Sequence, residues 1–161
     1  MSSSVFPRFE PELNIIYWGP QLAIDGNYSK NTTSVGFFHS DGESYPWHMT
    51  ILERPIHLVS VVIYNRNDAR GDRLKLVEIR AGKRTIKGNH KGRITENTIC
   101  GTFFGPGETG GIYTVKCDNH IDANIITLQI VENGAQFLQL DEVEFIKGIC
   151  YNIAIKTQDD Y

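Results

Sequence analysis

The chain has 161 residues, 40% of them hydrophobic, and its 16 basic and 19 acidic residues give a formal net charge of −3. This size fits one compact domain with its own core, and the mild negative charge excludes the broad positive field that nucleic acid or an anionic membrane would require. No run approaches the about 20 apolar residues of a membrane-spanning helix, so no membrane insertion is expected, and neutral ligands or other proteins are the expected partners.

The first segment, residues 1–12, is rich in Ser, Pro and Glu and is interpreted as an N-terminal arm or leader. It lacks the basic start and apolar stretch of a secretory signal. The chain is therefore either made without such a signal or is a mature form. Asn27 and Asn31 each begin an N-glycosylation pattern, which favours the mature form of a secreted, extracellular protein.

The predicted elements that follow are short strands, separated by turn sequences rich in Gly, Asn, Asp and Pro. No long segment shows the period of about 3.6 residues that marks an amphipathic helix. Many short strands without a helix predict an all-β, antiparallel sandwich or barrel. The apolar and β-branched runs occupy residues 14–17, 49–52, 56–64, 74–80, 98–104, 112–115, 125–131, 137–145 and 150–156.

A charged loop, residues 65–73, joins two of these strands and contains three arginines and two aspartates. Such a polar turn can simply be solvated. Its arrangement also allows a second interpretation, because Arg66 ends one strand, Arg73 begins the next, and Asp68 and Asp72 are near enough to fix both guanidinium planes. The loop then presents a fixed fork of hydrogen-bond donors.

Three cysteines leave one unpaired if the other two form a disulfide. Cys100 and Cys117 bracket a loop and a strand, and their pairing would close a loop of a size for which a disulfide stabilises by about 3 kcal/mol. Cys150 then remains as a free thiol or as a route to an intermolecular link, which leaves a homo-oligomer open.

No arrangement of nucleophile and base indicates an enzyme. The chain has no Gly-x-Ser-x-Gly elbow, no His-Glu-x-x-His helix and no phosphate-binding glycine loop. Glu142 and Glu144 are expected to point to opposite faces of a strand, and so not to form a catalytic pair. The sequence predicts a non-enzymatic protein.

Residues 13–148 resemble the F-type lectins, the fucolectins related to eel agglutinin. The segments that carry the resemblance are Leu22–Asn27, Tyr45–Trp47, Ser60–Asp68, Asp72–Leu74, Val77–Arg80 and Leu140–Phe145. The resemblance implies an antiparallel jelly-roll β-sandwich of the discoidin-like kind, followed by a C-terminal strand or tail at residues 149–161. It also implies a partner, a fucosylated glycan or glycoprotein, and a matched Cys100–Cys117 bridge.

The family's sugar motif is a histidine, a distant arginine, a nearby aspartate and a second basic residue. His39, Arg66, Asp68 and Arg73 match it. The resemblance implies that His39 and the two arginines bind the 3-hydroxyl, the axial 4-hydroxyl and the ring oxygen of α-L-fucose, while Asp68 orients an arginine. The candidates for contact with the fucose methyl group, which could equally be core residues, are Phe37, Phe38 and Tyr45.

The family also carries a structural calcium ion. The resemblance assigns side-chain carboxylates to Asp25 and Glu142 and main-chain carbonyls to Leu22, Asn27, Gly36 and Asp141. Calcium takes six to eight hard oxygen ligands, so this set is chemically reasonable. On the simpler interpretation, residues 25–27 form only a turn.

The chain departs from the family in the charged loop. Many members have two adjacent cysteines where Ala69 and Arg70 stand, and Asp141 replaces another cysteine. The tripeptide Arg70-Gly71-Asp72 also matches the motif of integrin ligands. A protein-interaction or cell-adhesion module on the same sandwich, with this tripeptide exposed or the sugar site lapsed, is therefore the alternative function, and lipid binding through loop tips is a third.

Overall fold

The computed structural model describes residues 1–5, 18–28, 36–84 and 92–148. All strand pairings among these residues are antiparallel. Among the same residues, no helix combines the length and the apolar character needed to cross a membrane.

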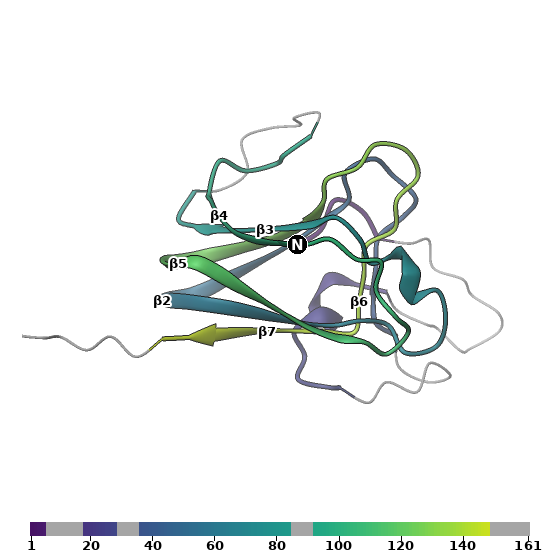
Figure 1. The fold of residues 1–161 in the computed structure, drawn as a ribbon, viewed down its shortest axis with the longest axis horizontal. Coiled ribbons are helices and arrows are strands. Elements are labelled where there is room, and N and C mark those ends of the chain that lie inside the picture. The colour runs from purple at the N-terminus through teal and green to yellow at the C-terminus, as the bar shows by residue number, and fades with distance from the viewer. Residues whose placement is uncertain (6–17, 29–35, 85–91, 149–161) are drawn as a thin grey trace, which may run out of the picture.

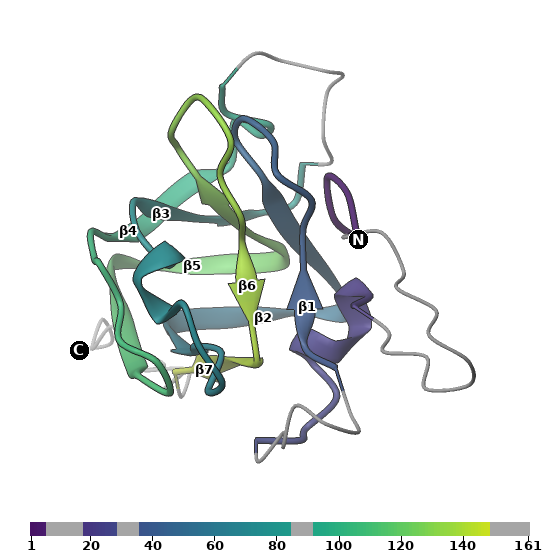
Figure 2. The same cartoon turned by 90° about the vertical axis from the view of Figure 1, so that its right-hand side faces the viewer.

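The larger sheet has five strands in the order β4-β3-β5-β2-β7. Its two long strands, which are far apart in the sequence, lie next to each other and form one extended antiparallel ladder. A second sheet pairs two short strands that cross one end of the larger sheet, as Figures 1 and 2 show. The elements are η1 (Pro20–Ala23), β1 (Phe38–His39), β2 (Trp47–Tyr64), η2 (Gly71–Arg73), β3 (Val77–Gly82), β4 (Thr98–Phe103), β5 (Ile112–Ile130), β6 (Gln139–Leu140) and β7 (Glu142–Lys147), where η marks a short 3-10 helix.

Alternation along β3 shows how the sequence builds the core. Val77, Ile79 and Ala81 are fully buried in the main apolar cluster. Glu78 and Arg80 occupy the other face, where they form an ion pair of 2.6 Å. Because side chains on a strand alternate between faces, this pattern fixes which face of the sheet is buried.

The predicted strands are confirmed in kind, but several differ in extent. Runs 49–52 and 56–64 belong to a single strand, β2, with a register shift between Ile51 and Ile56. Runs 112–115 and 125–131 likewise join in β5. Run 137–145 divides into β6 and β7 at Asp141. Runs 14–17 and 150–156 lie outside the described residues.

A disulfide joins Cys100 in β4 to Cys117 in β5 and confirms the predicted pairing. Cys100 is fully buried in the main core. The disulfide therefore links the edge strand β4 of the five-stranded sheet to its central strand β5. Cys150 lies outside the described residues.

The first five residues lie along the beginning of β2. Ser3 N–H donates to Trp47 O at 3.0 Å, and Met49 N–H donates to Met1 O at 2.7 Å. Part of the predicted arm is therefore attached to the sheet. Its predicted boundary at residue 12 lies outside the described residues.

Candidate functional site

Two arginines and a histidine from separate elements meet at the end of the molecule where β1 and β6 cross the larger sheet (Figure 2). His39 lies on β1, Arg66 follows the end of β2, and Arg73 ends η2. The positive charges of both arginines influence the titration of His39. The structure thus brings together the three residues that the resemblance assigns to the sugar.

Aromatic rings support both arginines. The Arg66 guanidinium carbon lies 4.7 Å from the centre of the Phe37 ring, and that of Arg73 lies 4.4 Å from the Phe137 ring. The His39 ring lies between these two aromatics, 6.0 Å from Phe37 and 5.8 Å from Phe137. Cation–π contact holds a guanidinium plane parallel to a ring without using its N–H donors. The donors therefore remain available at fixed positions.

Asp68 fixes Arg66 further. Arg66 Nε and Nη2 donate to the two carboxylate oxygens of Asp68, each at 2.6 Å. Burial of the Asp68 carboxyl raises its pKa, but hydrogen bonds from Arg66 and from the Ala69 backbone outweigh this effect and leave the pKa below its ordinary value. The bidentate pair uses two of the three guanidinium nitrogens and leaves Nη1 for another acceptor.

His39 is held by two neighbours and is 6% exposed. Its Nδ1 lies 2.6 Å from Ser40 O, and its Nε2 lies 2.5 Å from the side-chain nitrogen of Gln139, its partner across the β1–β6 pair. A carbonyl can only accept, so we assign the proton to Nδ1, and Nε2 accepts from the Gln139 amide. Burial lowers the pKa of His39 to about 4, against the hydrogen bond to Ser40, and the charges of Arg66 and Arg73 lower it further. His39 is therefore neutral near pH 7.

Sequence reasoning did not single out Gln139 or Phe137. Both lie in the predicted run 137–145, but their partners come from distant segments: His39 for Gln139, and Arg73 for Phe137. Phe137 also lines a groove of about 390 Å³ that borders Arg73. The period of a single strand identifies neither contact, because one depends on how β1 pairs with β6 and the other on where η2 lies beside the segment before β6.

The predicted apolar candidates lie below this surface. Phe37 and Phe38 are both fully buried. Phe38 belongs to the main core cluster, which is the second of the two roles expected for it. Phe37 lies beneath Arg66. Tyr45 is partly exposed at a turn with φ of 59°, where its carbonyl accepts from Gln129 at 3.0 Å.

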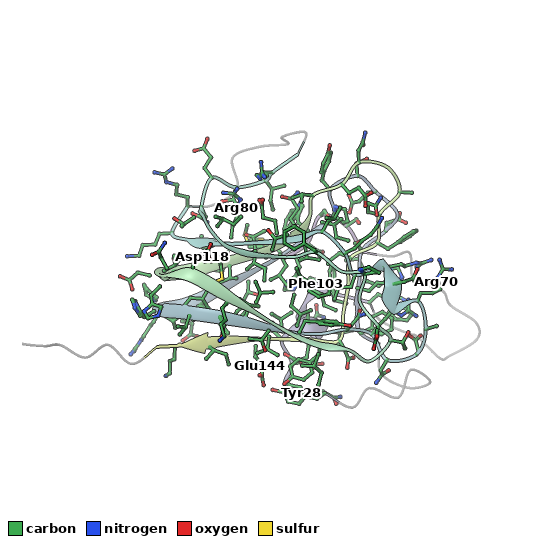
Figure 3. All side chains as sticks on the ribbon, viewed as in Figure 1. Tyr28, Arg70, Arg80, Phe103, Asp118 and Glu144 are labelled. Atoms are coloured by element: carbon green, nitrogen blue, oxygen red, sulfur yellow. A yellow bond between two sulfur atoms is a disulfide. The ribbon has the colours of Figure 1, made fainter. Side chains whose placement is uncertain are left out.

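Acidic residues gather beside the start of β7. Glu142 is 3% exposed, and its Oε2 accepts from Gly26 N–H at 3.0 Å. Glu144 accepts from the Tyr28 hydroxyl at 2.7 Å, and Figure 3 shows these two side chains together. A hydrogen bond to Glu144, then burial and the charges of Glu144 and Glu142, raise the pKa of Tyr28 to about 12. Negative charge therefore accumulates here.

The expectation that Glu142 and Glu144 face opposite sides of β7 is wrong. Residues two positions apart on a strand share a face. The charges of both glutamates accordingly act on Tyr28 and on Tyr64. The two glutamates lie on one face, where Glu144 accepts from both tyrosine hydroxyls.

The residues predicted to bind calcium come from two adjacent segments. Leu22 lies in η1, Asp25 and Asn27 follow it, Asp141 immediately precedes β7, and Glu142 is the first residue of β7. Gly36 immediately follows residues that the structure does not describe. Among the described residues, no group of three or more His, Cys, Asp or Glu side chains forms a metal site. The predicted shell is mostly made of main-chain carbonyls, and the calcium ion stays a prediction.

The tripeptide at residues 70–72 has a packing role. Gly71 is buried, and a Cβ atom there would lie 2.2 Å from Thr109 N. Glycine is therefore required by the close approach of the loop at residues 108–109. Arg70 and Asp72 are exposed, and Arg70 Nε lies 3.7 Å from Asp72 Oδ1. Their use in cell adhesion stays a prediction.

Comparisons with known proteins agree on one kind of fold. Residues 22–128 match the family model described as NedA-like, galactose-binding domain, of the F5/8 type C group. Fucolectin-1 of Anguilla japonica is 29% identical over 125 residues, which cover 78% of this chain and 66% of that protein. Fucolectin of Anguilla anguilla is 38% identical over 95 residues, or 59% of this chain and 56% of that protein.

Solved structures match over most of the chain. The fucolectin from striped bass (Morone saxatilis) serum has a TM-score of 0.70 at 24% identity, with 91% of this chain and 45% of that chain covered. A fucose binding module of Streptococcus pneumoniae has a TM-score of 0.63 at 21% identity, with 91% and 89% covered. The chain thus spans between 45% and 66% of the fucolectins it matches. These matches confirm the predicted antiparallel jelly-roll sandwich.

Proposed function

Because the chain belongs to the NedA-like, galactose-binding domain family of F5/8 type C domains, we propose that it is a non-enzymatic lectin that binds terminal α-L-fucose. The observation that carries the proposal is the convergence of His39, Arg66 and Arg73, with each guanidinium plane supported by a phenylalanine ring. The similarity to fucolectins supports the choice of sugar. The similarity to carbohydrate-binding modules supports binding without catalysis.

A neutral sugar offers no charge to attract, so selectivity depends on donors at fixed positions. A hydrogen bond from a charged donor contributes about 1.5–3 kcal/mol before other costs. Arg66 and Arg73 keep their charge at any ordinary pH, and a planar guanidinium can donate to two adjacent sugar oxygens. A few such bonds in an open site predict micromolar binding, about −8 kcal/mol, which clustering of several sites would strengthen.

His39 would act as an acceptor for the sugar. Its Nδ1 proton is used by Ser40 O, so Nε2 presents a lone pair. A sugar hydroxyl can donate to this lone pair alongside the Gln139 amide, which keeps the ring oriented, and can accept from an arginine at the same time. Such chains of hydrogen bonds strengthen one another in a partly buried site.

We further propose that calcium supports this site from the acidic side. Asp25 and Glu142 would supply carboxylates, and Leu22, Asn27, Gly36 and Asp141 would supply carbonyls. The bond between Gly26 N–H and Glu142 supports the proposal, because it holds the two ligand segments side by side. Calcium would be a structural ion, since these residues precede β1, which carries His39, and follow β6, which carries its partner Gln139.

The expected setting is extracellular. A relative comes from serum, and the disulfide of this chain suits an oxidising compartment. Fucosylated glycans or glycoproteins would be its partners there. A homo-oligomer would supply the clustered sites that weak single binding needs.

Isothermal titration with L-fucose tests the proposal. Arg73→Ala should remove detectable binding, because a lost charged hydrogen bond weakens binding by about 10-fold to more than 100-fold. Arg66→Ala and His39→Ala should also remove detectable binding, while the circular dichroism spectrum of each variant stays unchanged.

Lys116→Ala is the matched control for these variants. It removes an exposed positive charge near Asp118, at the opposite end of the molecule from Arg70 in Figure 3. Unchanged binding in both arginine variants would remove the site assignment.

A further inference from the structure

A groove of about 390 Å³ lies next to the proposed fucose site and shares Arg73 and Phe137 with it. Three loops form the groove. Its lining consists of Arg70, Asp72, Arg73, Lys75, Pro106, Ala135, Gln136 and Phe137. A glycan whose fucose occupies the proposed site would extend its next sugar across this surface.

The groove carries more positive than negative charge. Three of its lining residues are cations and one, Asp72, is an acid. Lys75 pairs with Glu132 at 2.7 Å, whereas the distance between Arg70 and Asp72 is 3.7 Å and both side chains are more than half exposed. The described part of the chain gives Arg73 no ion pair. A local excess of positive charge therefore sits on a protein whose formal net charge is −3.

The surroundings of Arg73 show the same excess. Burial lowers the pKa of Arg73, and the like charges of Arg70 and Arg66 lower it further, against the opposing effect of Asp72. Like charges held together repel each other, and a bound anion relieves this repulsion. Arg70 can reach such an anion because its side chain is 61% exposed and points outward from the end of the molecule (Figure 3).

We propose that this groove binds an anionic group, either a sulfate ester on the sugar that is linked to fucose or the carboxylate of a sialic acid attached to that sugar. The inference rests on the proposed function. Phe137 and Pro106 give the second sugar apolar surface, and Arg70 and Arg73 give its anionic group charged donors, which bind sulfate and carboxylate oxygens in pairs. The small size of the groove and the acidic remainder of the protein favour a single substituent over a polyanion.

The test compares fucosylated oligosaccharides that are identical except for the sugar next to fucose, which is neutral, sulfated or linked to sialic acid. Titration of the wild-type protein at low salt should give at least 5-fold tighter binding for one of the two anionic forms. The sulfated and sialylated arms distinguish the two sources of negative charge. The preference should shrink as sodium chloride is added, because salt screens exposed charges.

Arg70→Ala should remove the preference while the affinity for free L-fucose stays unchanged, and Lys116→Ala, a charge change at the other end, should keep the preference. Equal affinity for the neutral and both anionic forms, with fucose still bound, overturns the inference alone. The same holds if Arg70→Ala and Lys116→Ala behave alike. Absence of fucose binding in the wild-type protein overturns the proposed function and, with it, this inference.

Discussion

The cationic region around Arg66 and Arg73 and the acidic region around Glu142 and Glu144 hold their charges by different means. The cationic region uses aromatic faces for both arginines and one carboxylate, Asp68. In the acidic region, the donors that reach the glutamates include a backbone N–H and two tyrosine hydroxyls, all neutral. The first region is the proposed sugar site, and the second contains Glu142, a proposed calcium ligand.

One short stretch of chain joins the two regions. Gln139 contacts His39, and Glu142 receives the hydrogen bond from Gly26 three residues later, about 10 Å along an extended chain. Tyr64, opposite Glu142 in the sheet, also precedes Arg66 by two residues. A change in the acidic region should therefore alter the position of both a histidine contact and an arginine.

Acid is expected to produce the largest effect, because the cationic region depends on a neutral His39. Burial lowers the pKa of His39 and of His48 from 6.5 to about 4. The unfolded chain therefore binds up to two more protons than the folded chain between these values. The free energy of unfolding should fall as pH drops through this window, by about 1.4 kcal/mol per pH unit for each histidine.

Urea unfolding at a series of pH values measures this slope. His48→Gln should reduce the slope by about half, because it removes one of the two histidines that contribute. His48 lies outside the cationic region, where its ring contacts Phe38 and its Nε2 lies 2.8 Å from Pro20 O. A flat stability profile from pH 6.5 to 4 would show that folding lowers the pKa of neither buried histidine.

Calcium tests the acidic region and should give the next largest effect. An ion present at 100 times its dissociation constant stabilises the folded state by about 2.7 kcal/mol, which raises Tm by about 5–10 °C for a chain of this size. Differential scanning calorimetry with calcium or a chelator measures the shift. Glu142→Gln should abolish it, whereas Glu53→Gln, an exposed carboxylate on β2, should preserve it. An identical shift in both variants would remove Glu142 from the ligand set.

The sequence predicted the strands better than their connections. Alternation and turn residues identify β3 and β4, because those signals are local. The continuity of β2 was missed because Pro55, which has no N–H to donate, interrupts the pattern. The strand continues through it as an exposed irregularity, and the register shifts there. Both 3-10 helices were also missed, since each is a short turn without a helical period.

The candidate site was likewise predicted only in part. The resemblance located His39, Arg66 and Arg73, and the loop chemistry explained why Asp68 would hold an arginine. Phe137 and Gln139 were not predictable in those terms, because a single sequence does not show which residues meet across β1 and β6. The error over Glu142 and Glu144 is of another kind, since the period of a strand already places them on one face.

Substitution of Gln139 gives the smallest predicted effect. It is also a specific test, because it separates the role of Gln139 in positioning His39 from its role in the stability of the fold. Gln139→Leu should weaken fucose binding about 5-fold, roughly 1 kcal/mol, since the His39 ring loses the amide that orients its Nε2. Stability should change little, because an apolar side chain removes the cost of Gln139 Oε1, which is buried without a hydrogen-bond partner, and this gain offsets the loss of the donor to the buried His39 Nε2. A residue that only fills space would lose stability and affinity together.

Gln139→Glu extends the test. A carboxylate beside His39 raises the pKa of the His39 ring and favours the protonated ring, so fucose binding should become weaker toward acid pH. Equal affinity in the wild type and both variants, measured from pH 5 to 8, would show that the cationic region orients His39 without Gln139.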